Sequence, residues 1–126
     1  MPKSSIFPVR VDLPLAQANR IIESALAKGK ERGFMPLTVV VMDSGGHIVA
    51  MAREDGAGNV RQQIAQGKAR GALGLGIASR TIGERNQGRE AFLAALAAAA
   101  DGQFIPVAGG VLVLEDGVAI GAVGIS

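Results

Sequence analysis

The chain has 126 residues, a formal net charge of +2 and 48% hydrophobic residues. This length fits one folded domain with a real core, and a charged fraction of only 19% excludes a disordered polyelectrolyte. Cysteine is absent, which excludes disulfide bonds, thiolate metal sites and cysteine nucleophiles. We see no signal-peptide pattern and no apolar run of about 18 residues, so we expect a cytoplasmic protein without a membrane partner.

Residues 1–12 are interpreted as an N-terminal tail, and residues 13–126 as a single domain. The domain begins with a predicted helix over about residues 13–32. Its apolar residues recur at helical spacing: Leu15, Ala18, Ile22 and Ala25.

A β-hairpin follows, with strands predicted at about residues 37–42 and 47–52 around a turn rich in Asp and Gly. The run Val39-Val40-Val41 is apolar without alternation. Both faces of this strand should therefore be covered, and a layer of helices on each side of the sheet would cover them.

A second helix is predicted over about residues 59–78, although Gly67, Gly71, Gly74 and Gly76 fall within it. Each interior glycine costs about 0.5–1 kcal/mol relative to alanine, so these glycines need a reason. Close packing through Gly67 and Gly71 is the favoured interpretation, and backbone exposed to a ligand is the alternative. The glycine-rich segment 71–76 lacks the spacing of a dinucleotide-binding motif.

The last third of the chain contains a short polar segment at 79–88, an Ala-rich helix at about 89–101, and strands at about 103–107, 111–115 and 118–125. Hairpin-linked strands with helices inserted between two strand groups indicate an α+β fold with an antiparallel sheet. The predicted sheet has five strands.

Charge is unevenly distributed. Residues 53–89 contain seven Lys or Arg residues against three acidic ones. This excess suits a small anionic ligand. Nucleic acid is not expected as a partner, because no aromatic residue interleaves the basic ones and Trp and Tyr are absent.

The order of elements and several short motifs resemble the GlcG/HbpS-like haem-binding family, which also occurs as the C-terminal domain of PduO-type corrinoid adenosyltransferases. The resemblance spans about residues 13–126, and the matching segments are distributed along it: 15–18, 41–50, 53–57, 65–70, 109–111, 116–117 and 121–126. The resemblance implies a profilin-like fold with a five-stranded antiparallel sheet between helices, and it implies homo-oligomers. It also makes haem a candidate cofactor, since some members bind it. The usual C-terminal helix of the family has no counterpart in this sequence.

Ligand-binding candidates are Arg53, Asp55, Lys68, Gly109 and Gly110. Arg53 offers a planar fork to a carboxylate, or it pairs with Asp55 to order the loop; both interpretations stay open. Lys68 should face this loop if its helix buries Ile64 and Gly71. Gly109 and Gly110 either bend a strand or let a ligand approach the backbone.

His47 is the only histidine and a weak candidate for a haem ligand. One histidine in a hairpin, without a partner at metal-ligand spacing, is a poor metal site, and no other metal site is predicted.

Three functions stay open. The leading one is a small-ligand-binding oligomer, with haem or a small carboxylated metabolite as ligand. The second is a tautomerase, isomerase or lyase in which Lys68 or Asp55 moves a proton. The third is an accessory or structural subunit.

Overall fold

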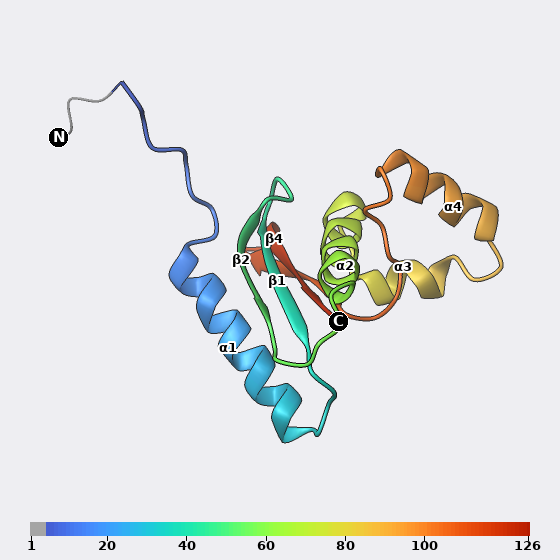
Figure 1. The fold of residues 1–126 in the computed structure, drawn as a ribbon. Coiled ribbons are helices and arrows are strands. Elements are labelled where there is room, and N and C mark those ends of the chain that lie inside the picture. The colour runs from blue at the N-terminus through green and yellow to red at the C-terminus, as the bar shows by residue number, and fades with distance from the viewer. Residues whose placement is uncertain (1–4) are drawn as a thin grey trace.

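The computed structural model describes residues 5–126. These residues contain a four-stranded antiparallel sheet, in the order β2-β1-β4-β3, and four helices (Figure 1). The elements in chain order are α1 (Leu15–Glu31), β1 (Thr38–Asp43), β2 (Ile48–Arg53), α2 (Arg61–Leu75), α3 (Ser79–Arg85), α4 (Glu90–Ala99), β3 (Gly110–Glu115) and β4 (Val118–Ile125).

Helices cover both faces of the central strand β1, as its apolar run predicts. On one face, Val39 and Val41 join α1 residues such as Ile22 in a buried cluster. On the other face, Val40 packs with Ala65 of α2 in a second cluster. Figure 1 shows α1 and α2 on opposite sides of the sheet. The α+β class with an antiparallel sheet is therefore confirmed.

The predicted strand at 103–107 is wrong, so the described sheet has four strands instead of five. This segment lies against α2 instead: the Ile105 amide donates to the Gly67 carbonyl at 3.1 Å. A Cβ at Gly67 would lie 2.8 Å from the Ile105 side chain, and one at Gly71 would lie 3.2 Å from Phe104. Gly67 and Gly71 therefore serve close packing, as the favoured interpretation held, whereas Gly74 has no atom within 4 Å of a Cβ and Gly76 caps the helix with a φ of +72°.

The N-terminal segment takes an extended path away from the body of the molecule (Figure 1). Residues 5–12 form no helix or strand, and the first four residues of the predicted tail lie outside the described part. Leu13 marks the point where the chain enters the core, since it is almost fully buried.

The residues described do not include a helix with the length and apolarity needed to cross a membrane.

Candidate functional site at one end of the sheet

Three polar side chains form one row across the end of the sheet. Arg53 pairs with Thr38 in the register of β2 and β1. Thr38 and Ser126 exchange two backbone hydrogen bonds, at 2.7 and 3.0 Å. Directly opposed residues of antiparallel strands point to the same face. This is the face of α2. Side chains alternate between the two faces along β1, so Thr38 points to the same face as Val40, which packs against α2, and not to the face of Val39.

Helix α2 adds two cations beside this row. The Arg61 Nη1 atom donates to the Ser126 hydroxyl at 3.2 Å, and the Lys68 Nζ atom donates to the Ile125 carbonyl at 2.9 Å. The two cations are separated by about two helical turns, so they share one face of α2. Arg53, Arg61 and Lys68 together form the cationic row. Adjacent strands lie about 4.8 Å apart, so the backbones of Arg53 and Ser126 lie about 10 Å apart across β1.

Lys68 is the buried member of the cationic row. It is only 8% exposed, and its pKa is lowered, first by burial and then by the charge of Arg61. Buried charges in proteins are normally paired. No ion pair within residues 5–126 involves Arg53, Arg61 or Lys68. No acidic side chain of the described residues therefore neutralises the cationic row.

Thr38 adds a buried polar group without a hydrogen-bond partner on the same face. It is fully buried, and its hydroxyl oxygen has no hydrogen-bond partner. Buried hydroxyls are nearly always satisfied, and leaving one unpaired costs about 1–3 kcal/mol. A polar ligand atom or a water molecule at this end of the sheet would satisfy it.

The structure brings Lys68 together with Gly109 and Gly110. A Cβ at Gly109 would lie 2.9 Å from the Lys68 Nζ atom, and a Cβ at Gly110 would collide with the Lys68 carbonyl. Gly109 also has a φ of +127°, which side-chain-bearing residues rarely adopt. These two glycines make room for Lys68, a packing role that neither of the two sequence-based interpretations included.

Asp55 lies in the exposed loop after β2, and no ion pair of the described residues joins it to Arg53 or Lys68. The predicted Arg53–Asp55 loop-ordering pair is therefore not formed. Glu54 orders the loop instead, since its carboxylate accepts from the Leu37 amide at 2.8 Å. Arg53 and Asp55 also line an open hollow of about 560 Å³, together with Lys30 of α1.

His47 lies in the β1–β2 turn, at the end of β1 away from Thr38. Its side chain is 78% exposed and faces the Asp43 carboxylate at 3.4 Å. The same carboxylate oxygen accepts from the backbone amides of Gly45 and His47, both at 3.0 Å. His47 thus takes part in turn formation, at the far end of the hairpin from the cationic row (Figure 1).

Sequence reasoning did not single out Arg61, Thr38 or Ser126. A signal for Arg61 existed, because it precedes Lys68 by two turns of a predicted helix. Thr38 and Ser126 gave no comparable signal, since their roles follow from the pairing of segments at opposite ends of the domain.

Comparison with known proteins places the chain in a family. A family model described as "Haem degrading protein HbpS-like" matches residues 13–126. The chain belongs to the HbpS-like family. The GlcG protein of Escherichia coli strain K12 is 33% identical over 118 residues, which cover 93% of this chain and 83% of that protein.

Several solved structures share the fold. The Klebsiella pneumoniae protein ORFY has a TM-score of 0.81 at 25% identity, and the match covers 100% of this chain and 85% of the ORFY chain. A crystal structure of a PduOC:heme complex has a TM-score of 0.79 at 24% identity and covers 90% of this chain and 81% of its own. Streptomyces reticuli HbpS, solved as a double mutant, has a TM-score of 0.77 at 21% identity and covers 100% of this chain and 82% of its own.

Proposed function

We propose that this HbpS-like chain binds a small carboxylate-bearing ligand at the cationic row. The observation that carries the proposal is the burial of Lys68 beside Arg61 without an acidic partner among the described residues. An anion at this end of the sheet would offset the repulsion between the two cations and the cost of burying one of them. Arg53 and Arg61 supply planar forks for the carboxylate oxygens, and Lys68 supplies a point charge.

The other predicted ligand-binding residues have supporting roles in this proposal. Gly109 and Gly110 keep the Lys68 amine close to the end of β4, because any side chain there would displace it. Asp55 lines the same open hollow as Arg53, which the α2 cations do not line, and there its carboxylate favours ligands that carry a hydrogen-bond donor besides the carboxylate.

Haem is the ligand that the relatives suggest, through the PduOC:heme complex and the family's description. The cationic row fits the two propionate groups of haem. His47 does not fit as an axial ligand to a haem held there, because it lies in the opposite turn and is mostly exposed. Haem is thus one carboxylated candidate beside smaller metabolites.

Replacing His47 with alanine is expected to leave haem binding unchanged. The reason is the exposure of His47 and its pairing with Asp43 inside the turn. Haem titration followed by the Soret band compares the variant with the wild type. Loss of a strong Soret shift in His47→Ala would instead make His47 the iron ligand.

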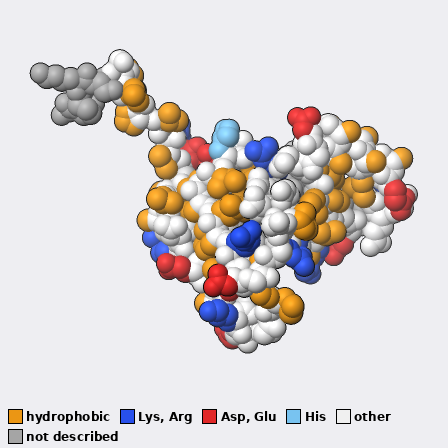
Figure 2. Space-filling model, viewed as in Figure 1, with side chains coloured by type: hydrophobic (Ala, Val, Ile, Leu, Met, Phe, Trp, Pro, Cys, Tyr) orange, Lys and Arg blue, Asp and Glu red, His pale blue; other side chains and the backbone are white. Residues whose placement is uncertain are grey.

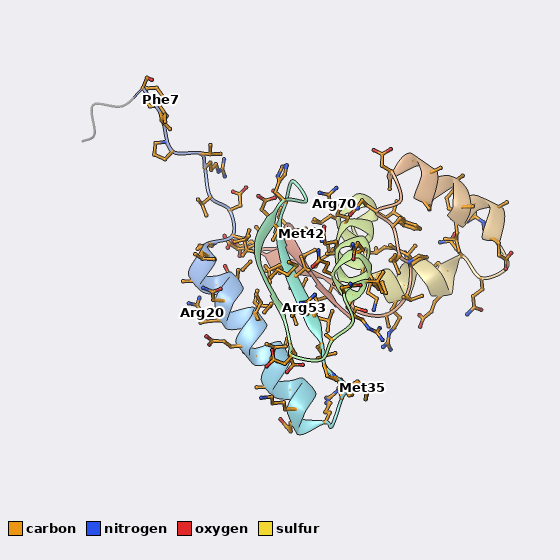
Figure 3. All side chains as sticks on the ribbon, viewed as in Figure 1. Phe7, Arg20, Met35, Met42, Arg53 and Arg70 are labelled. Carbon is orange, nitrogen blue, oxygen red and sulfur yellow. The ribbon has the colours of Figure 1, made fainter. Side chains whose placement is uncertain are left out.

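Replacing Arg53 with lysine keeps the charge but removes the fork. We expect carboxylate binding to weaken by about 1–3 kcal/mol, the contribution of a charge-assisted hydrogen bond. Isothermal titration with acetate, pyruvate, succinate and haem measures the change. Arg20→Lys, on the exposed surface of α1, is the matched control (Figure 3). An unchanged dissociation constant in Arg53→Lys would leave Arg53 a structural residue.

An enzymatic function is the second candidate, favoured by the lowered pKa of Lys68. A lysine whose pKa is lowered holds more neutral amine near neutral pH, and neutral amine is the form that accepts a proton. The test is exchange of the α-protons of a carboxylated carbonyl compound, such as pyruvate, in heavy water. Exchange that disappears in Lys68→Met would establish a tautomerase-like or isomerase-like role; Asp55→Asn tests the other proton carrier.

The remaining proposals concern partners and location. A cytoplasmic address is proposed from the sequence pattern, and an accessory-subunit role predicts a protein that co-purifies with the chain. Homo-oligomers are proposed from family membership, and size-exclusion chromatography with light scattering detects them.

A further inference from the structure

The N-terminal arm, residues 7–11, has the pattern of a β-strand but pairs with no strand of the described chain. Apolar residues alternate along it: Phe7, Val9 and Val11 are separated by Pro8 and Arg10. Phe7 and Val9 are 78% and 86% exposed. Figure 3 shows Phe7 far from the sheet, and the orange patches on the arm in Figure 2 are surrounded by solvent.

Strand β3 offers an edge with matching character. It lies at the end of the sheet and pairs only with β4 among the described strands. Its sequence carries no Lys or Pro, the residues that usually protect such edges from further pairing. Val111 and Leu114 of this strand are 49% and 61% exposed.

The sheet face beside β3 is also incompletely covered. Helix α1 packs on β1 and β2, whereas α2 packs on β4, β3 and β1 from the opposite side. On the face that α1 occupies, no helix therefore covers β3. Val111 and Val113 point to this face, on the same side as the buried Val123; Val111 is half exposed, whereas Val113 is partly buried against the core. Exposed apolar side chains gathered at an unpaired sheet edge mark a place where another segment can bind.

We propose that the arm of one copy adds to the edge of β3 in a second copy, as a fifth strand. Phe7, Val9 and Val11 then extend the apolar rows of Val111 and Val113. A second copy is the occupant because one chain carries both halves of the contact, so a reciprocal exchange closes with twofold symmetry. Backbone pairing gives such strand addition its affinity, and the alternating side chains set its register.

The arm does not serve its own sheet in this arrangement. Leu13 anchors it against β4, where the Leu13 Cδ1 atom would lie 2.6 Å from a Cβ at Gly121. From that anchor the arm leads outward, with Arg10 held by Asp12 at 3.3 Å (Figure 1). The proposal is independent of the cationic row, which lies at the end of β1 opposite the hairpin turn.

The absence of cysteine allows a direct crosslinking test. Two single variants, Val9→Cys and Val111→Cys, are mixed and oxidised mildly with copper-phenanthroline. We expect a mixed disulfide dimer between the two chains. Ala95→Cys, on an exposed position of α4, replaces Val111→Cys in the matched control and should give far less mixed dimer.

Two results would overturn the proposal. One is a disulfide within a single chain when both cysteines are placed in one copy at high dilution, which would assign the arm to its own sheet. The other is a mixed dimer no more abundant than in the Ala95→Cys control.

Light scattering over a dilution series adds a readout without cysteine. The wild type should be dimeric or larger, and Val9→Asp should dissociate at least tenfold more readily. A wild type that stays monomeric at every concentration also contradicts strand exchange.

Discussion

Replacing Gly124 with alanine should destabilise the fold by about 3 kcal/mol, which corresponds to a fall in the melting temperature of about 10 °C for a domain of this size. Gly124 lies in β4 beneath α2. A Cβ there would collide with the Ala65 carbonyl and lie 3.2 Å from the Ala69 side chain. The helix would have to move off the sheet, because the obstructing atom is backbone and cannot rotate aside.

Gly74→Ala is the matched control on α2. No atom lies within 4 Å of a Cβ at Gly74, and a helix gains about 0.5–1 kcal/mol from this change. Thermal unfolding followed by circular dichroism compares both variants with the wild type. Equal melting temperatures for Gly124→Ala and the wild type would mean that α2 and β4 are not in such close contact.

Replacing Lys68 with methionine should weaken carboxylate binding by about 10- to 100-fold, since a hydrogen bond to a charged group contributes about 1.5–3 kcal/mol. Methionine keeps much of the length of the side chain and fills the space against Gly109. The change also removes the cost of burying a charge, which offsets the lost hydrogen bond to Ile125. Stability should therefore change by no more than about 1 kcal/mol while affinity falls.

Arg70→Met provides the comparison for Lys68→Met. Arg70 is an exposed cation on the same helix, next to Gly46 of the hairpin turn (Figure 3). Titration calorimetry with the same carboxylates should give wild-type affinity for this variant. Equal losses in the two variants would attribute binding to general positive charge on α2 and not to the buried amine.

Local sequence patterns predicted most helices and strands, because each pattern depends on residues close together in the chain. The unalternating run at Val39-Val40-Val41 required cover on both faces, and the structure provides it. The segment 103–107 has strand-forming residues, yet it packs on α2, because two helix glycines leave a groove that Phe104 and Ile105 fill. A contact between segments so far apart in the chain is not visible in either segment alone.

The candidate site, too, could be predicted where it depends on local spacing and not where it depends on contacts between distant segments. The helical face of Lys68 could be inferred from spacing, and the structure places Lys68 against Gly109 and Gly110. The partnership of Arg61 with Ser126 could not be inferred, because it depends on how α2 crosses the end of β4. The Arg53–Asp55 pair failed for a local reason: Glu54 satisfies the Leu37 amide and fixes the loop without Asp55.

Carboxylate binding at the cationic row is tested most directly by nuclear magnetic resonance. The ¹⁵N-labelled protein is titrated with acetate, pyruvate, succinate and haem. We expect saturable shifts at the side-chain nitrogens of Arg53 and Arg61 and at the amides of Gly109 and Gly110, and in Lys68→Met these shifts should need at least tenfold more ligand. Saturable shifts confined to the His47 turn, or no shift with any of these carboxylates, would contradict binding at the cationic row.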